Sequence, residues 1–269
     1  MKDEKMVASF DGTELRLRKD LVPEPKALIV IAHGLCEHLN RYDHFTERLN
    51  EQGYSVYRFD QRGHGKSKGD KVFFGSFNEM PDDTNVIIDM AREESEGKKV
   101  FLFGHSMGGE TVALYGTKYP GKTDGIITSG ALTRYNLELF GNELPFEAPA
   151  KSYVPNSLGE GVCSDPAVIE AYVNDPLVEK EISFGLINEV YKGVQHLKTN
   201  AKAFTDPVLI LHGAKDGLVS EKDSRDFFGE IGSTDKSLRI YANLFHEILN
   251  EPSKEEVISD IVLWLNKHL

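Results

Sequence analysis

The sequence has little cysteine and no long apolar run. Its two cysteines, Cys36 and Cys163, lie far apart and form no CxxC pair, which excludes a disulfide framework and a cysteine-based zinc site. No window holds the roughly 18 uninterrupted apolar residues of a membrane-spanning helix. The first five residues, MKDEK, carry acidic side chains where a signal peptide has a basic stretch and then an apolar run. We therefore expect a protein of the reducing cytoplasm with no targeting or membrane-spanning segment.

Basic residues are scarce relative to acidic ones. The 269 residues include 31 Lys and Arg against 43 Asp and Glu, which gives a formal net charge of −12 at pH 7. Such a surface repels phosphate backbones and anionic lipid headgroups at long range, so no nucleic-acid partner is expected. Internal repeats and low-complexity tracts are also lacking. With 40% hydrophobic and 28% charged residues, the composition is that of a globular chain long enough to bury a sizeable core.

The sequence does contain a regular alternation of strand and helix signals. Short apolar or β-branched runs predict buried strands at 26–32, 54–59, 99–103, 125–128, 207–211 and 237–241. Amphipathic stretches of helical length lie between most of them, at 41–52, 81–96, 108–119, 221–230 and 252–268. The alternation predicts an α/β fold with a mostly parallel central sheet flanked by helices. The stretch 7–17, with Asp11-Gly12 at its centre, predicts a hairpin added at the sheet edge.

One long segment departs from this alternation. Residues 132–204 hold no convincing strand but several helical patches, including 166–172 and 181–197. We interpret the segment as an inserted helical cap, or lid. The core is then formed by residues 1–131 and 205–269.

The predicted strand 99–103 runs directly into a G-x-S-x-G sequence. The residues GHSMG at 104–108 are followed at once by the helix-forming stretch 110–119. A serine between such a strand and helix is a nucleophile elbow, where the serine backbone is strained and the glycines leave room for neighbouring backbone. The pattern predicts Ser106 as a nucleophile, with an ordinary glycine-rich turn as the alternative.

A serine hydroxyl needs a histidine base, which in turn needs a carboxylate to orient it. Two later strand ends offer this pair in the chain order that follows such an elbow: Asp216 after strand 207–211 and His246 after strand 237–241. We predict Asp216 as the acid and His246 as the base; the alternatives are a turn residue and a solvent-facing loop histidine. His212 is a rival base, but it precedes the acid and is expected to pack beneath the acid loop.

The tetrahedral oxyanion of acyl transfer needs two fixed donors, usually backbone N–H groups. We expect one from Met107, directly after the nucleophile. The second is expected from Leu35, in the loop HGLCEH that follows strand 26–32.

Several histidines in and after that loop raise the question of a metal. His33, His38 and His44 lack the spacing of a zinc-binding helix such as H-E-x-x-H, and carboxylates do not cluster with them in the sequence. We expect no metal or other cofactor, because the predicted chemistry needs only water.

Together these motifs resemble those of bacterial monoacylglycerol lipases and lysophospholipases of the α/β-hydrolase superfamily. The HG loop at 33–38, the sequence FDQRGHGKS at 59–67, the elbow and the acid and histidine loops occur in the family's order over nearly the whole chain. The cap segment YVNDPL at 172–177 also resembles that of the family. The resemblance implies the α/β-hydrolase fold, the triad and oxyanion donors predicted above, and a mobile helical cap over an apolar acyl tunnel.

The resemblance also implies a polar end of the pocket that holds glycerol or another alcohol. In that family a Glu and an Arg of an HGxxEHxxRY stretch line it, and here they are Glu37 and Arg41, whose charges suit a diol. An i,i+4 ion pair that braces the helix start is the alternative. Animal monoglyceride lipases carry a further histidine three residues after the catalytic one, where this chain has Leu249. Leu35 and Cys36 form a bulkier pair at the acyl entrance than the small residue of many members.

An apolar stripe at the start of the cap is a further candidate for the substrate pocket. Its members fall at helical spacing: Leu132, Tyr135, Leu139 and Phe140, continued by Leu144 and Phe146. The stripe either packs on the core or lines the acyl tunnel, and a third interpretation is transient contact with a lipid surface.

The sequence therefore predicts a serine carboxylic ester hydrolase that cleaves a small-molecule acyl ester, such as a monoacylglycerol or lysophospholipid, through an acyl-enzyme. One alternative is a short-chain, phenolic or xenobiotic carboxylesterase, which would differ in the shape of the cap. Another is an iminopeptidase-like amide hydrolase, which needs an acidic pocket for a free amine, with Glu37, Glu143 or Glu147 as candidates. A non-catalytic ligand-sensing module of the same fold is the third.

Overall fold

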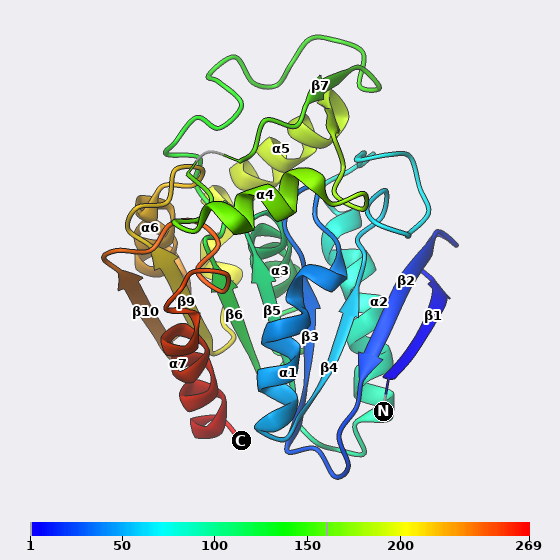
Figure 1. The fold of residues 1–269 in the computed structure, drawn as a ribbon, viewed down its shortest axis with the longest axis vertical. Helices are drawn as coiled ribbons and strands as arrows, with labels where there is room; N and C mark the ends of the chain where they lie inside the picture. Colours follow the sequence, from blue (N-terminus) through cyan, green and yellow to red (C-terminus); the bar gives the residue numbers. More distant parts are fainter. Residues whose placement is uncertain (1, 160) are drawn as a thin grey trace.

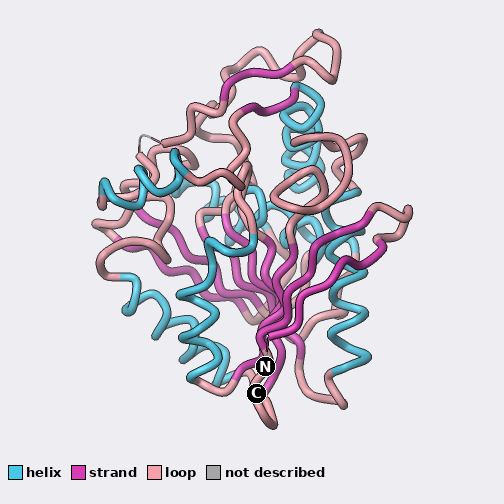
Figure 2. Tube along the Cα trace, turned by 45° about the vertical axis from the view of Figure 1, so that its right-hand side comes forward, coloured by secondary structure: helices cyan, strands magenta, loops and turns pink. Residues whose placement is uncertain are grey.

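A twisted sheet of eight strands forms the centre of the molecule (Figure 1, Figure 2). The computed structural model describes residues 2–159 and 161–269. The strands lie in the order β1 (Lys2–Ala8), β2 (Glu14–Asp20), β4 (Tyr54–Phe59), β3 (Ala27–Ala32), β5 (Val100–His105), β6 (Gly125–Ser129), β9 (Val208–Gly213) and β10 (Lys236–Tyr241). Neighbouring strands are parallel except in the pairs β1–β2 and β2–β4. The predicted mostly parallel sheet is confirmed.

Helices cover both faces because successive side chains of a buried strand point to opposite sides. In β3, Ile29 and Ile31 pack in one apolar cluster with α1 (Asp43–Glu51) and α7 (Lys254–Lys267). Leu28 and Val30 pack in the other cluster. That second cluster contains residues from α2 (Glu79–Glu94), α3 (Met107–Lys118), α5 (Phe184–Asn200) and α6 (Glu221–Glu230).

The core elements match the sequence pattern closely. Each predicted strand and each core helix is present, with ends within two residues of the prediction. A short 3₁₀ turn over Leu39–Tyr42 precedes α1. The predicted edge hairpin is confirmed as the antiparallel pair β1–β2, with Gly12 between the strands at a φ of 88°.

The segment 132–204 is less regular than predicted. It contains α4 (Pro166–Asn174), α5 and a 3₁₀ turn at Ala201–Ala203. The labelled helices α4 and α5 are drawn above the ends of the parallel strands (Figure 1), whereas the turn packs against α3 and α6. The expectation of no strand was wrong, because β7 (Tyr153–Pro155) and β8 (Glu181–Ser183) form a small antiparallel sheet.

The helical spacing predicted for the stripe from Leu132 was also wrong, because residues 131–152 form no helix. The carboxylate of Asp223, at the start of α6, accepts hydrogen bonds from the backbone N–H groups of Arg134, Tyr135 and Asn136. Tyr135 also has a φ of 64°, outside the helical region. These N–H groups are therefore held by a side chain instead of an i−4 carbonyl.

Residues of the segment 132–204 contact the loop that follows β3. Asp175 Oδ2 lies 2.9 Å from His38 Nε2, and the Glu179 N–H donates to the Cys36 carbonyl at 3.0 Å. The Arg41 guanidinium lies 4.8 Å from the ring centroid of Tyr172, on α4. Across residues 2–159 and 161–269, no helix has both the length and the apolar character needed to cross a membrane.

Candidate active site

Ser106 lies at the sharp turn between β5 and α3. Its backbone has φ 57° and ψ −120°, a strained conformation for a residue with a side chain. The close approach of β5, α3 and β3 requires the two flanking glycines. A Cβ at Gly104 would overlap the carbonyl oxygen of Gly108, and one at Gly108 would overlap that of Ala32. The turn is thus held by backbone packing on both sides of the serine.

Asp216 and His246 form a buried pair after β9 and β10. Asp216 Oδ2 lies 2.6 Å from His246 Nδ1, while Oδ1 accepts from the N–H groups of Leu218 and Val219, both at 2.8 Å. A proton on Nδ1 that is donated to this carboxylate in a hydrogen bond leaves Nε2 unprotonated and able to act as a base. His246 lines the same cavity as Ser106. The structure therefore brings the three predicted catalytic residues into one region.

The charges of this pair shift both pKa values in opposite directions. Burial would raise the pKa of Asp216, but the neighbouring His246 and His212 hold it well below its usual range. Burial would lower the pKa of His246, but the charge of Asp216 and its hydrogen bond have a larger effect and raise that pKa above the ordinary value. Asp216 is accordingly an anion that stabilises a protonated His246.

His212 lies beneath the acid loop and is completely buried. Its Nε2 is 3.0 Å from both Asp216 Oδ2 and the Val219 carbonyl oxygen, and its Nδ1 is 2.7 Å from Ser224 Oγ. Both ring nitrogens of His212 therefore already have hydrogen-bonding partners. This arrangement suits a residue that supports Asp216, not a base.

Two further residues hold His246 in place. The ring of His105 lies 4.6 Å from that of His246, and burial lowers the His105 pKa to about 3, so it stays neutral. Gly130 follows β6 with a φ of 53°, and a Cβ there would lie 3.1 Å from His246 Nδ1. A side chain at this position would crowd the histidine.

The residues expected to donate to the oxyanion, Leu35 and Met107, both lie close to Ser106. Met107 is the first residue of α3, where the helix itself leaves backbone N–H groups without partners. Leu35 lines the cavity over Ser106 together with Gly34. The cavity holds about 20 Å³, which is room for about one water molecule.

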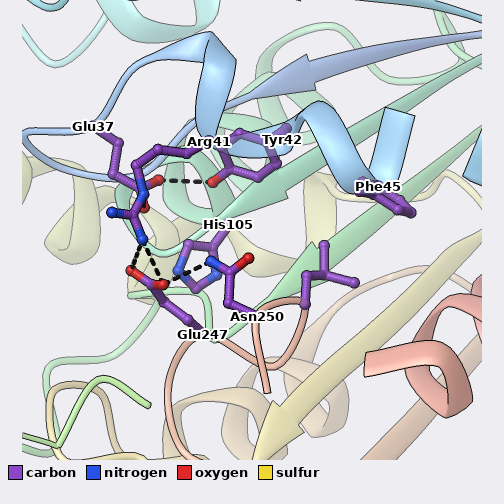
Figure 3. Close-up of a pocket in the computed structure, with 8 residues that line it drawn as sticks. Glu37, Arg41, Tyr42, Phe45, His105, Glu247 and Asn250 are labelled. Atoms are coloured by element: carbon purple, nitrogen blue, oxygen red, sulfur yellow. Dashed lines mark hydrogen bonds and ion pairs between the residues drawn. The ribbon is translucent and has the colours of Figure 1, made fainter. Parts of the chain in front are cut away.

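A second cavity shares the lining residues Glu37, His105 and Glu247 with the first. Figure 3 shows the side chains that line this second cavity. Arg41 lies between the two carboxylates. Its Nη2 donates to both oxygens of Glu247, at 2.7 and 2.6 Å, and its Nε lies 3.0 Å from Glu37 Oε1. The Glu37–Arg41 ion pair that was considered as a brace for the helix start is present. The same two side chains also line a cavity, as expected of pocket residues.

The two carboxylates around Arg41 differ in what else they bind. Glu37 Oε2 also accepts from Tyr42 Oη and the Gly34 N–H, each at 2.8 Å. Burial would raise its pKa, but Arg41 and the nearby polar groups lower it to about 2. Glu247 accepts from Asn250 Nδ2 at 2.7 Å, and burial raises its pKa although Arg41 opposes the shift.

Other predicted pocket residues lie elsewhere. The Cys36 side chain is fully buried in the core, where burial raises the pKa of its thiol. Leu132, Tyr135 and Phe140 pack on or within the apolar cluster over α3, and Leu139 is half-buried. Among the described residues that line the two cavities, none of these five is included.

The histidines considered for a metal each have another partner. His33 Nε2 accepts from the Gln61 N–H at 2.9 Å, His38 faces Asp175, and His44 Nε2 lies 2.6 Å from Glu255. No three metal-ligating side chains gather in the part of the chain that the structure describes.

Sequence reasoning missed Glu247, Asn250, His105 and Gly130. The signal for Glu247 was its position directly after His246, because a neighbour of a catalytic residue shares its loop and lies near the pocket. The guanidinium that it binds comes from 206 residues earlier in the chain, and nothing in the local sequence reveals that pairing.

The strained serine after a central parallel strand, with the acid and histidine after later strands, places the chain in the α/β-hydrolase class. A model of the family described as Hydrolase_4, serine aminopeptidase, S33, matches residues 23–253, and the chain belongs to that family.

Similar proteins include several lipases. A monoacylglycerol lipase of Mycolicibacterium smegmatis is 33% identical over 253 residues, which cover 91% of this chain and 90% of that protein. The crystal structure of a Paleococcus ferrophilus monoacylglycerol lipase matches with a TM-score of 0.81 at 32% identity, covering 95% of this chain and all of that one. A soluble variant of the Saccharomyces cerevisiae monoglyceride lipase, in complex with a substrate analog, matches with a TM-score of 0.86 at 25% identity, covering 99% and 94%.

Proposed function

We propose that the protein is a serine ester hydrolase that cleaves monoacylglycerols into a fatty acid and glycerol. The observation that carries the proposal is the buried Asp216–His246 pair, whose histidine lines the same cavity as the strained Ser106. The similarity to monoacylglycerol lipases over nearly the whole chain supports the choice of substrate.

In the proposed mechanism the Ser106 hydroxyl attacks the ester carbonyl while His246 Nε2 takes its proton. Asp216 holds the imidazole and stabilises its charged form. The N–H groups of Leu35 and Met107 bind the oxyanion. His246 then returns the proton to the leaving glycerol oxygen, and water, activated by the same histidine, releases the fatty acid.

The proposal includes a cap, residues 132–204, that moves to admit the acyl chain. The cavity over Ser106 is smaller than a fatty acyl group, and Leu158 and Tyr172 of the cap form part of its wall. Val173 on α4 and Leu137 are exposed apolar residues of the cap, at 56% and 40% of their surface, which suits brief contact with a lipid surface. We place this activity in the cytoplasm because of the cysteine usage.

The esterase alternative differs in the alcohol and acyl group it accepts. The experiment that separates the two is hydrolysis of p-nitrophenyl esters from acetate to palmitate, alongside monoacylglycerols of the same chain lengths. Activity that includes long-chain monoacylglycerols supports the proposal. Activity confined to short or aromatic esters overturns the choice of substrate while keeping the triad.

The iminopeptidase alternative needs carboxylates that are free to bind an amine. Glu37 is already engaged by Arg41, Tyr42 and a backbone N–H, and Glu143 and Glu147 are exposed. A panel of aminoacyl arylamides tests it, and we expect no turnover.

A further inference from the structure

Glu247 adds a second carboxyl group to the polar end of the site, beside the predicted Glu37–Arg41 pair. Its side chain is buried and forms part of the wall of both cavities. Figure 3 shows it reaching toward Arg41, with both carboxylate oxygens on the same guanidinium nitrogen. This is the geometry of an ionised carboxylate paired with a cation.

Arg41 is therefore shared between two acids. Its guanidinium faces Glu247 on one side and Glu37 on the other, and it also lies against the ring of Tyr172. Of the described residues that line the two cavities, Arg41 alone is a lysine or arginine. His105 is neutral, since its pKa is near 3. Arg41 is thus already paired with both carboxylates, and the polar end has no further lysine or arginine that could bind a phosphate.

We infer that Glu247 makes this site select ester substrates whose alcohol is uncharged and reject those whose alcohol carries a phosphate. The inference rests on the proposed function, because it concerns the alcohol attached to the acyl group that Ser106 attacks. Glycerol hydroxyls donate hydrogen bonds, which carboxylates accept. A phosphate in the same place has only acceptors, would face two buried carboxylates, and would have to take Arg41 from both of them.

The first test uses the wild-type enzyme with two soluble substrates that differ only in one phosphate: monobutyryl glycerol and monobutyryl glycerol 3-phosphate. Both are monomers in solution, so no charged lipid surface contributes. We expect kcat/KM for the neutral ester to be higher by about tenfold or more. Equal values for the two esters would overturn the inference and leave the proposed hydrolase activity standing. Hydrolysis of neither ester, with no activity on longer monoacylglycerols, would instead be a failure of the proposed function.

The second test assigns the selectivity to Glu247. The substitution Glu247→Gln keeps the size of the side chain and removes its charge, so the ratio of kcat/KM between the neutral and phosphorylated esters should fall at least about fivefold. The matched control is Glu93→Gln on the exposed side of α2, which makes the same change in net charge far from the site. An equal fall in both variants would indicate a long-range effect of net charge and would overturn the role of Glu247.

If Glu247→Gln does not fold, inhibition of the wild-type enzyme gives the same comparison. Glycerol should compete with the neutral ester, and glycerol 3-phosphate should not compete at a tenfold higher concentration. Inhibition by glycerol 3-phosphate at the concentration that glycerol requires would contradict the inference.

Discussion

At the scale of single residues, the proposed mechanism depends on the charge that Asp216 gives to His246. The carboxylate is fixed by two backbone N–H groups and by His212, so it cannot turn away from the imidazole. It raises the pKa of His246 against the effect of burial. The histidine acts as a base only when it is unprotonated, so this shift sets the lower pH limit of activity.

The first prediction concerns that limit. In the wild-type enzyme, kcat/KM should rise with pH through a value above the ordinary histidine pKa of 6.5. In Asp216→Asn the charge that raises the pKa of His246 is gone, so the rising limb should move to lower pH and kcat should fall by about 10³ to 10⁴. A pH–rate profile of both proteins on a soluble ester measures this. A limb that stays at the same pH in the variant would show that Asp216 does not face the catalytic base.

At the scale of elements, the elbow depends on how closely α3 approaches β3. Gly108→Ala places a Cβ against the Ala32 carbonyl oxygen, so we expect a loss of about 2 kcal/mol or more in the free energy of unfolding, together with reduced activity. Gly229→Ala, on an open surface of α6, is the matched control and should be neutral or stabilising by up to about 1 kcal/mol. Denaturant titration of both variants tests the pair. Similar stabilities would mean that the elbow tolerates a side chain.

A second prediction at this scale concerns the contact between α3 and α5. Glu110 is fully buried, and within the described part of the chain neither of its carboxylate oxygens has a hydrogen-bond partner. Gly193 of α5 makes room for it, since a Cβ there would overlap Glu110 Oε1. Burial raises the pKa of Glu110 well above its ordinary value, so the folded protein holds this carboxyl protonated.

The unfolded chain ionises Glu110 near pH 4.5, and the folded chain does so only at a higher pH. Between these two values the unfolded state loses a proton that the folded state keeps, so rising pH destabilises the wild-type protein by up to about 1.4 kcal/mol per pH unit. Glu110→Gln removes this contribution, and its stability relative to wild type should increase as the pH rises from 5 to 8. Urea titrations across that range measure the difference in stability, and a difference that stays constant would show that the pKa of Glu110 does not change on folding.

The elements also show how much of the fold the sequence predicts. The buried strands and amphipathic helices of the core are local patterns, and so is the serine turn, so all of them were predictable. The segment after Leu132 was not, because its apolar spacing is helical while its backbone is held by Asp223, about 90 residues later. The Arg41–Glu247 contact was hidden for the same reason, since it joins two loops that only the fold brings together.

At the scale of the whole molecule, the net charge of −12 affects how the protein meets a lipid surface. Long-range repulsion opposes anionic surfaces, and salt screens it. We expect faster hydrolysis of a monoacylglycerol in neutral detergent micelles than in anionic mixed micelles at low ionic strength, with the difference shrinking toward about 0.5 M salt. Faster hydrolysis in anionic micelles would mean that a local basic surface outweighs the net charge.

The proposed role of Ser106 is tested by hydrolysis of a long-chain monoacylglycerol by the wild-type protein and by Ser106→Ala, with release of fatty acid and glycerol measured for both. We expect the wild type to release the two products in equal amounts and the folded variant to be slower by about 10³-fold or more. A folded Ser106→Ala protein with wild-type activity would contradict this role, because the reaction would then proceed without the proposed nucleophile.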